Sequence, residues 1–480
     1  MPTSFLFYDL ETFGSDPRRT RIAQFAAIRT DPELNPIGEP ISVFAKPADD
    51  LLPSPIATLI TAIAPQTALR DGVSEAELFA LIFDEMSRPE TCSVGYNSLR
   101  FDDEFVRHGL FRNFYDPYER EWRGGNSRWD LLDVFRLAHA LRPDGIVWPQ
   151  REDGATSFKL EHLAEHNGVR EGDAHEALSD VRALIALARK LKAAQPRLWD
   201  YALKLRDKRY AAQLLDIIGM APVLHVSQRF PASRLCAAPV LPLARNPRID
   251  SRVIVFDLTQ DPEGLLTLDA DDIADRLYTP ATDLPEGETR IALKQVHLNR
   301  CPALVAWDHL READLQRLCI DPAVVEQRAA RLRAAGPALA EKVRRVFAGE
   351  RERMPSDADA SLYDGFIGDG DKRLCGDVRA TPPPKLATRT FAFRDPRLAE
   401  LLFRYRARNW PQTLNANEQQ RWDDYRRQRL SVDSGLSEYC FDSFRTELKM
   451  QRELHARDGA KLALLDQLEA WGNDIEASLR

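Results

Sequence analysis

The chain has 480 residues and a formal net charge of −8, with 44% hydrophobic and 29% charged residues. These proportions exclude a disordered or fibrous chain, and the length favours two to four domains, because one hydrophobic core seldom covers so many residues. No apolar run approaches the roughly 18–20 residues of a membrane span, and no basic and apolar leader opens the sequence, so we expect a cytoplasmic protein. The six cysteines stand far apart without a C-x-x-C pair, which favours reduced, structural thiols over a zinc or redox site.

Residues 1–195 alternate short β-rich runs with amphipathic stretches, the pattern of an α/β domain. Pro196 ends the last amphipathic stretch and marks the first predicted domain boundary. The predicted strands are residues 4–10, 23–30 and 91–97, and the predicted helices are residues 74–86 and 175–194.

Two further domains are predicted after this boundary. Residues 196–349 carry apolar runs separated by Pro, Gly and Asp turns, so we expect a small β-rich domain. Residues 350–480 show helical periodicity and predict a helical domain, with TPPPK at 381–385 as a connector. The apolar runs are residues 222–227, 251–258 and 290–307, and the helical stretches are residues 395–409, 418–429 and 459–479.

Two carboxylates, Asp9 and Glu11, stand at the end of the first apolar run, in FLFYDLETFG. Alternate side chains of a strand share a face, so the two would project from the same side about 7 Å apart. Like charges this close repel each other unless they lie at an exposed edge or around hard divalent cations, which take carboxylate oxygens readily. The D-x-E spacing recurs elsewhere in the chain, where a solvated pair is the simpler interpretation. The first copy follows a β-rich run, and strand ends are where α/β folds tend to hold their sites.

Two later segments add acids to this pattern. In GYNSLRFDDEF, residues 95–105, an apolar run leads into a polar turn with an acid behind an aromatic residue. In DAHEALSDVRAL, Asp173 and Glu176 make a plausible capping box at a helix start. Five helical steps separate His175 from Asp180 by roughly 140°. The two converge on one centre only if His175 lies in the loop or a frayed first turn, which predicts a mobile histidine; a surface histidine beside a capped helix is the alternative.

The ordered set YDLET, NSLRFD and HEALSD resembles the three motifs of the DEDD exonuclease superfamily, in the DEDDh subclass with a histidine five residues before the last aspartate. RIAQFAAIRTD, KPADDLLPSP, NSRWDLLDVFRLAHALRP and LLFRYRARNWPQTL are similar to bacterial exonuclease I, and the likeness extends over essentially the whole chain. The resemblance implies a ribonuclease-H-like exonuclease domain, an SH3-like domain and a C-terminal helical domain closing round a channel for single-stranded DNA. It implies a processive 3′–5′ exodeoxyribonuclease that releases 5′-mononucleotides and acts in DNA repair and recombination.

Carried over motif by motif, the resemblance also implies the catalytic residues. The superfamily uses the aspartate directly after the phenylalanine of its second motif, hence Asp102 rather than Asp103. Four carboxylates give enough oxygen ligands for two Mg²⁺ ions about 3.5–4 Å apart, or for Mn²⁺, which activate a water and hold the departing 3′ oxygen. The implied metal ligands are Asp9, Glu11, Asp102 and Asp180, and the implied general base is His175.

Single strands are commonly held by aromatic platforms alternating with cationic groups, and residues 107–130 interleave the two kinds. Glu11, Thr12 and Phe13 are placed to contact the terminal nucleotide. Core packing is the alternative for Phe13 and for every other aromatic residue of the set. Local basic excesses at 201–250 and 391–430 fit either solvated faces or channel walls. The further candidates for strand contact are Arg107, Tyr118, Trp122, Trp129, Phe158 and Lys159.

The family also suggests a protein partner, the acidic C-terminal tail of single-stranded DNA-binding protein. A tail that ends in a carboxylate and an apolar residue needs arginine beside a hydrophobic recess, and Arg142, Tyr201 and Arg311 are the candidates. No oligomer signal is found, so a monomer is the default.

Two rival functions stay open at the level of sequence. The nearest is another DEDDh enzyme, a 3′ exoribonuclease or a proofreading subunit, against which the two additional domains argue. The other is a non-catalytic strand-binding adaptor, against which the complete acidic and histidine motifs argue. The net negative charge argues mildly against a general nucleic-acid binder.

Overall fold

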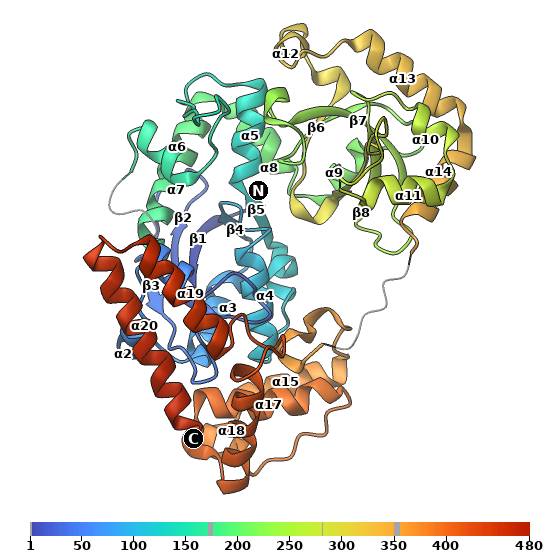
Figure 1. The fold of residues 1–480 in the computed structure, drawn as a ribbon. Coiled ribbons are helices and arrows are strands. Elements are labelled where there is room, and N and C mark those ends of the chain that lie inside the picture. Colours follow the sequence, from blue (N-terminus) through green and yellow to red (C-terminus); the bar gives the residue numbers. More distant parts are fainter. Residues whose placement is uncertain (1, 171–175, 281, 350–355) are drawn as a thin grey trace. The chain divides into compact units, whose positions relative to one another are not determined.

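The computed structural model describes residues 2–170, 176–280, 282–349 and 356–480 (Figure 1). The chain forms two compact units. This grouping places the C-terminal helical region together with most of the N-terminal α/β region. It differs from the predicted division into three domains at residues 195 and 349, and that division stays a prediction. The first unit comprises residues 1–127, 170–185 and 353–480, and the second comprises residues 128–169 and 186–352.

The first unit is built on a mixed sheet. Its strands are adjacent in the order β3-β2-β1-β4, with β1 antiparallel to β2 and parallel to β4. Because β1 is central, its residues are buried on both faces, which explains the nearly continuous apolar run before Asp9. The three strands predicted at 4–10, 23–30 and 91–97 are confirmed as β1, β2 and β4. The strand bounds are β1 (Ser4–Thr12), β2 (Ile22–Thr30), β3 (Ile41–Phe44) and β4 (Thr91–Gly95).

Helices α3 (Glu75–Ser87) and α4 (Asp102–Arg112) pack on one face of this sheet, where Phe79 and Leu110 share a hydrophobic core with Leu6 of β1. Ser74 begins α3 with a capping box to Glu77. The remaining elements of this part of the chain are α1 (Pro55–Thr61), α2 (Pro65–Asp71), the 3₁₀ turns Glu119–Glu121 and Arg123–Gly125, and β5 (Ser127–Asp130).

The carboxyl end of β1 is open on one side. Its pairing with β4 ends at Phe7 and Val94, whereas its pairing with β2 continues to Thr12. The chain leaves β4 at Gly95 and begins α4 at Asp102. The last residues of β1 therefore lie beyond the end of an adjacent parallel strand, which is where open α/β sheets hold their functional groups.

Residues 356–480 are helical, as predicted. In the first unit, α19 (Phe441–Leu454) and α20 (Gly459–Ser478) pack on α1. The predicted connector at 381–385 contains the short helix α16. The elements are the 3₁₀ turn Ala358–Tyr363, α15 (Asp369–Ala380), α16 (Pro383–Leu386), α17 (Pro396–Asn409), the 3₁₀ turn Pro411–Thr413, α18 (Ala416–Leu430), α19 (Phe441–Leu454) and α20 (Gly459–Ser478).

The basic excess of residues 391–430 is largely internal. Five arginine side chains of α17 and α18 are buried and paired with carboxylates, so they do not form a basic surface. The five are Arg404, Arg406, Arg408, Arg426 and Arg429.

The second unit contains a five-stranded antiparallel sheet in the order β10-β6-β7-β8-β9. Hydrophobic cores lie on both faces of this sheet, and helices supply part of each core. The strands are β6 (Val223–Val226), β7 (Ala237–Arg245), β8 (Arg252–Asp257), β9 (Leu293–His297) and β10 (Ala303–Ala306). The helices are α5 (Leu131–Leu141), α6 (Leu160–His166), α7 (Ala177–Ala194, which starts in the first unit), α8 (Pro196–Lys204), α9 (Lys208–Leu214), α10 (Glu263–Thr267), α11 (Ala270–Tyr278), α12 (Glu312–Arg317), α13 (Pro322–Ala334) and α14 (Gly336–Val346), with 3₁₀ turns at Ala232–Arg234, Leu298–Arg300 and Trp307–His309.

The predicted α/β fold class, with a β-rich second part and a helical end, is confirmed. Among the described residues, no helix has both the length and the apolar character needed to cross a bilayer. None of the six cysteines, all of which the structure describes, forms a disulfide bond.

Candidate active site

Three carboxylates from two elements of the first unit meet at the open end of β1. One carboxylate oxygen from each of Asp9, Glu11 and Asp180 lies within 4.8 Å of the others. Asp9 and Glu11 alternate on β1, so they share a face as predicted. Asp180 arrives from the first turn of α7, and its Oδ1 accepts a hydrogen bond of 2.5 Å from Arg170 Nη1. Residues 9 and 180 are thus brought together by the fold alone.

The neighbouring acids Asp102 and Asp103 have different surroundings. Asp103 is almost fully buried, and its Oδ1 accepts hydrogen bonds from Tyr8 Oη at 2.9 Å and from Arg120 Nη2 at 2.6 Å. Asp102 is the first residue of α4, and its charge is among those that raise the pKa of Asp9 and Glu11. The hydrogen bonds of Asp103 therefore give it a structural role, whereas Asp102, which is not one of the three carboxylates within 4.8 Å, acts on the cluster through its charge.

The clustered carboxylates destabilise one another's charged forms. Burial, and then the charges of Asp102, Glu11 and Asp180, raise the pKa of Asp9 well above its usual value. Burial and the charges of Asp180, Asp102 and Glu176 raise the pKa of Glu11 to about 8. Across the described ranges, no arginine or lysine forms an ion pair with Asp9 or Glu11. A divalent cation would relieve this repulsion, and carboxylate oxygens are the ligands that hard cations prefer. The donor set therefore fits a metal site.

The predicted general base, His175, lies outside the described residues, as does Asp173 of the predicted capping box. Helix α7 begins at Ala177. Just before it, Glu176 Oε2 accepts a hydrogen bond of 2.8 Å from Ser179 N. The helix therefore begins three residues after the start that a capping box at Asp173 predicts, and Asp180 lies in its first turn.

Comparisons with known proteins agree with this site and extend over the whole chain. Residues 6–188 match a family described as exonuclease, residues 206–349 match the exonuclease I SH3-like domain, and residues 356–475 match the exonuclease I C-terminal domain. Exodeoxyribonuclease I of Escherichia coli is 45% identical over 474 residues, which cover 98% of each chain. The chain belongs to the exonuclease I family.

Solved structures of the exonuclease I family have the same fold. Exonuclease I from Methylocaldum szegediense superposes with a TM-score of 0.94 at 46% identity, over 98% of this chain and 99% of that one. A zinc-bound complex of E. coli exonuclease I with single-stranded DNA superposes with a TM-score of 0.93 at 45% identity, over 99% of this chain and 100% of that one.

Two of the predicted strand-contact residues lie in the hydrophobic core. Phe13 is 2% exposed and packs with Ala23, Leu51 and Ile63 in the first unit. Trp129 is 1% exposed in the second unit, where its ring meets that of Trp199 edge-on at 4.7 Å. Core packing, the alternative left open by the sequence, accounts for both rings, and a contact with DNA stays a prediction for each.

Two other candidates in the first unit, Arg107 and Tyr118, are in contact with each other. Arg107 is held by Glu104 and Glu121 and stacks over the Tyr118 ring at 5.5 Å. The Phe366 ring lies 6.1 Å from that of Tyr118. Sequence analysis missed Phe366, because it lies 248 positions after Tyr118 and the only sequence signal is an aromatic residue in a polar loop.

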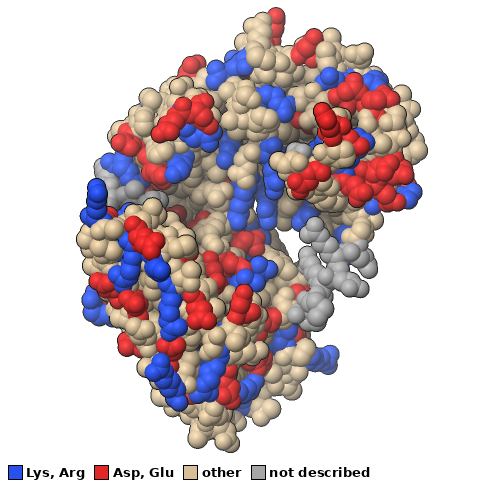
Figure 2. Space-filling view, in the orientation of Figure 1, with Lys and Arg blue, Asp and Glu red and all other residues tan. Residues whose placement is uncertain are grey.

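Two aromatic residues of the first unit are largely exposed. Trp122 is 66% exposed and Phe366 is 88% exposed, values that are unusual for such large apolar rings. Stacked nucleobases would cover such rings. Figure 2 shows acidic and basic side chains interspersed over most of the visible surface of each unit.

Phe158 and Lys159 belong to the second unit. Arg136 stacks over the Phe158 ring at 5.6 Å, and the His139 ring meets it edge-on at 5.4 Å. The Lys159 ammonium is exposed and pairs with Glu161 at 3.2 Å. These two residues thus combine an aromatic ring with nearby cations, as strand contact requires.

The predicted partner residues are also in the second unit, where two of them converge. Arg142 Nη1 and Arg311 Nη2 donate to the same atom, Asp314 Oδ1, at 2.7 and 2.8 Å. Asp314 is buried and holds the two guanidinium groups together. The Tyr201 hydroxyl donates to Leu304 O at 2.9 Å.

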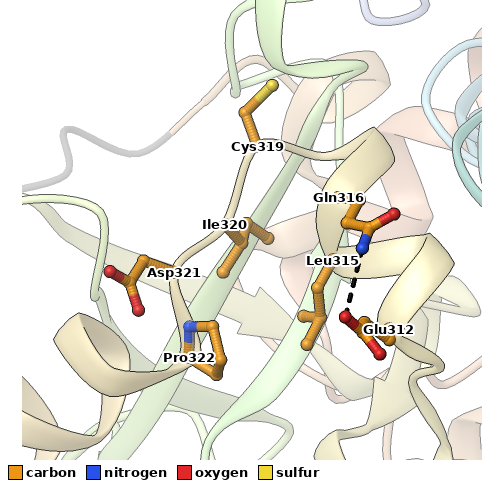
Figure 3. A pocket seen from close by; sticks show the side chains of 7 residues that line it. All are labelled: Glu312, Leu315, Gln316, Cys319, Ile320, Asp321 and Pro322. Atoms are coloured by element: carbon orange, nitrogen blue, oxygen red, sulfur yellow. Dashed lines mark hydrogen bonds between the residues drawn. The ribbon is translucent and has the colours of Figure 1, made fainter.

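A pocket of about 470 Å³ lies between α12 and α13 (Figure 3). Leu315, Ile320 and Pro322 form its apolar part, and Gln316 Nε2 donates to Glu312 Oε1 at 3.2 Å on its rim. None of the predicted catalytic residues that the structure describes lines it. The carboxylates of Glu312 and Asp321 also line the pocket and would repel an acidic tail, so the paired arginines carry more weight for partner binding than this pocket does.

Proposed function

We propose that this chain is a processive, Mg²⁺-dependent 3′–5′ exodeoxyribonuclease that degrades single-stranded DNA to 5′-mononucleotides in DNA repair and recombination. The observation that carries the proposal is the cluster of Asp9, Glu11 and Asp180, whose carboxylate oxygens lie within 4.8 Å of one another at the open end of β1. The E. coli relative has the same activity name, and a solved relative holds single-stranded DNA and a metal ion.

In this proposal Asp9, Glu11, Asp102 and Asp180 hold two cations. When bound, the cations would activate the attacking water and stabilise the departing 3′ oxygen. Asp103 serves as an internal control, because it neighbours Asp102 but is held by Tyr8 and Arg120. Asp102→Asn is expected to abolish cleavage and retain the fold. Asp103→Asn is expected to lower thermal stability, because it leaves Arg120 buried beside a neutral partner.

His175 is proposed to take the proton from the attacking water. Replacing it should slow the chemical step strongly, although less than loss of the metal ligands. A single-turnover assay of His175→Ala measures this step, and an unchanged rate would remove His175 from the role of base.

Strand contact is proposed for Glu11, Thr12 and Phe13 at the 3′-terminal nucleotide and for two groups further along the strand. The exposure of Trp122 and the ring and cation pairs at Tyr118 and Phe158 support it. The proposed contacts of these groups are Arg107, Tyr118, Trp122, Trp129, Phe158 and Lys159.

The acidic tail of single-stranded DNA-binding protein is the proposed protein partner, with Arg142, Tyr201 and Arg311 as its site. Asp314 supports this proposal by bringing the two guanidinium groups together. Binding of an acidic peptide with an apolar C-terminal residue should weaken in Arg142→Ala and in Arg311→Ala. Equal affinity in the wild type and both variants would place the partner elsewhere. A cytoplasmic monomer stays our expectation.

One time course tests the proposed function. A 5′-labelled single strand and its duplex are digested with and without Mg²⁺, and polarity, strand preference and processivity are measured together. Shortening from the 3′ end of the single strand, only with metal, is the expected result. Equal cleavage of a matched RNA strand would favour the exoribonuclease alternative, and failure to release mononucleotides would favour the adaptor.

A further inference from the structure

The loop that follows the two strand carboxylates is held by a residue more than four hundred positions away. Residues 13–21 connect β1 to β2. In this loop, Ser15 N donates to Glu438 Oε1 and Oε2 at 3.0 Å each, and Ser15 Oγ donates to Glu438 Oε1 at 2.7 Å. Both residues belong to the first unit. A single carboxylate thus accepts three hydrogen bonds at the turn next to the metal cluster.

Gly14 is fitted to this carboxylate. A Cβ added to Gly14 would lie 2.0 Å from Glu438 Oε2 and 2.9 Å from its Cδ. The backbone of Gly14 is not in the left-handed region, so conformational freedom does not explain the glycine. Its missing side chain makes room for Glu438.

The same turn contacts the residue beside the cluster. Thr12 Oγ1 donates to Gly14 O at 2.7 Å, and Thr12 directly follows Glu11 on β1. At the other end of the loop, Arg429 Nη2 donates to Arg19 O at 2.7 Å. A continuous series of contacts therefore runs from Glu438 through Gly14 and Ser15 to Thr12.

Attachment of the C-terminal helices does not depend on Glu438. Arg408 pairs with Asp50 at 2.8 Å, and Trp471 Nε1 donates to Leu51 O at 2.9 Å, both in buried surroundings. The Ser15–Glu438 contact is exposed, and exposed polar contacts of this kind add little to stability. A purely structural role therefore does not explain why Glu438 and Gly14 fit each other.

We propose that Glu438 is a positioning residue of the nuclease: it holds the Gly14–Ser15 turn and thereby fixes Thr12 and the end of β1 against the 3′-terminal nucleotide. This inference rests on the proposed role of Glu11 and Thr12 at that nucleotide. It assigns to the C-terminal helical region a part in the geometry of the active site.

The first test compares three variants on a labelled single strand. Glu438→Ala should lower kcat on the order of tenfold, because small misplacements of a reacting group are costly. KM for a long strand should change little, because most of its contacts lie elsewhere. Glu438→Gln keeps an oxygen that accepts from Ser15 and should recover most of kcat. Glu469→Ala, which removes a C-terminal carboxylate paired with Arg452, is the matched control and should leave kcat unchanged.

A double-mutant cycle tests the contact itself. Gly14→Ala forces Glu438 away and should lower kcat about as much as Glu438→Ala does. In Gly14→Ala/Glu438→Ala the two effects should not add, because the same contact is lost. Hydrogen exchange of residues 13–21 should be faster in both single variants than in the wild type. Additive losses, a kcat of Glu438→Ala equal to that of the control, or a Gln variant as slow as the Ala variant would each refute the positioning role.

The wild type and Asp9→Ala, run in the same assay, separate this inference from the proposed function. If the wild type digests the strand and Asp9→Ala does not, the nuclease assignment stands and the Glu438 variants are judged on their own. If both fail to digest it, the proposed function itself is refuted.

Discussion

The first unit contains two groups of closely spaced acids whose negative charge is compensated in opposite ways. Asp9 and Glu11 face Asp180 and Asp102, and burial together with these like charges raises the pKa of both. Asp50 and Asp359 are surrounded by arginine. The first group is complete only when a cation is supplied from outside, whereas the second group is already neutralised by the protein.

The arginine-rich group shows how such neutralisation is built. Arg408 donates to Asp359 Oδ1 at 2.8 Å and Oδ2 at 2.6 Å and also to Asp50 Oδ2 at 2.8 Å, while Arg404 adds a bond of 3.0 Å to Asp359. Burial alone would raise the pKa of Asp359, but Arg408 and Arg404 hold it well below its usual value. Burial of an acid therefore does not by itself mark a functional site. The charge of the neighbouring side chains distinguishes the two groups.

Removing an acid from the metal cluster should give the largest effect. In Asp9→Asn, turnover should fall by about a thousandfold or more, because metal assistance lowers the activation barrier by several kcal/mol. The thermal midpoint should stay the same or rise, since a source of like-charge repulsion is gone. Mononucleotide release and scanning calorimetry of the same preparation measure the two quantities. Near-normal turnover would remove Asp9 from the metal site.

Removing an acid from the arginine-rich group should instead lower stability and leave activity largely unchanged. Asp359→Ala leaves Arg404 and Arg408 buried beside fewer carboxylates, which should cost about 3–5 kcal/mol of unfolding free energy. Denaturant unfolding measures this loss. Below the unfolding transition, the rate per folded molecule should stay near that of the wild type. A stable Asp359→Ala protein would mean that water molecules solvate Arg404 and Arg408 in place of the lost carboxylate.

At acid pH, protonation of the acids of the arginine-rich group should determine how stability depends on pH. The folded-state pKa values of Asp50 and Asp359 are lowered, with Arg408 as the largest opposing influence to burial in both. Their stabilisation is therefore fully present above the unfolded pKa of about 3.9 and is lost as pH falls through and below that value. Asp359→Asn should flatten this acid limb of a thermal-midpoint curve. An acid limb identical to that of the wild type would assign it to other carboxylates.

Sequence reasoning found most of the strands and the pair of acids Asp9 and Glu11 for physical reasons. β1 and β4 are buried on both faces and so read as continuous apolar runs, and Asp9 and Glu11 follow from strand periodicity. β7 was not found, because Pro239 and Pro242 argue against a strand; the structure has an irregular register between Pro242 and Ala244, while Pro239 pairs with Leu224 of β6. The apolar α5 was also not assigned as a helix.

The remaining features depend on contacts between distant positions. Ser15 and Glu438 are 423 positions apart, and nothing in either local sequence indicates the other. The basic excess at 391–430 could be read from the sequence, but its burial against Asp50 and Asp359 could not. The choice of Asp102 over Asp103 came from the family motif, and Tyr8 and Arg120 supply its physical reason.

Metal binding should give the smallest of these effects, a change in thermal midpoint that depends on the acids of the metal cluster. A cation that binds only the folded protein at ten times its dissociation constant stabilises it by about 1.4 kcal/mol. Mg²⁺ or Mn²⁺ should therefore raise the thermal midpoint of the wild type modestly, and a chelator should reverse the rise. In Asp9→Asn the rise should disappear, because the cluster has lost a ligand, whereas Glu469→Ala should keep it, because that carboxylate lies on α20 and pairs with Arg452. A rise of equal size in Asp9→Asn would mean that the cation binds other acids of the chain and not the cluster at the end of β1.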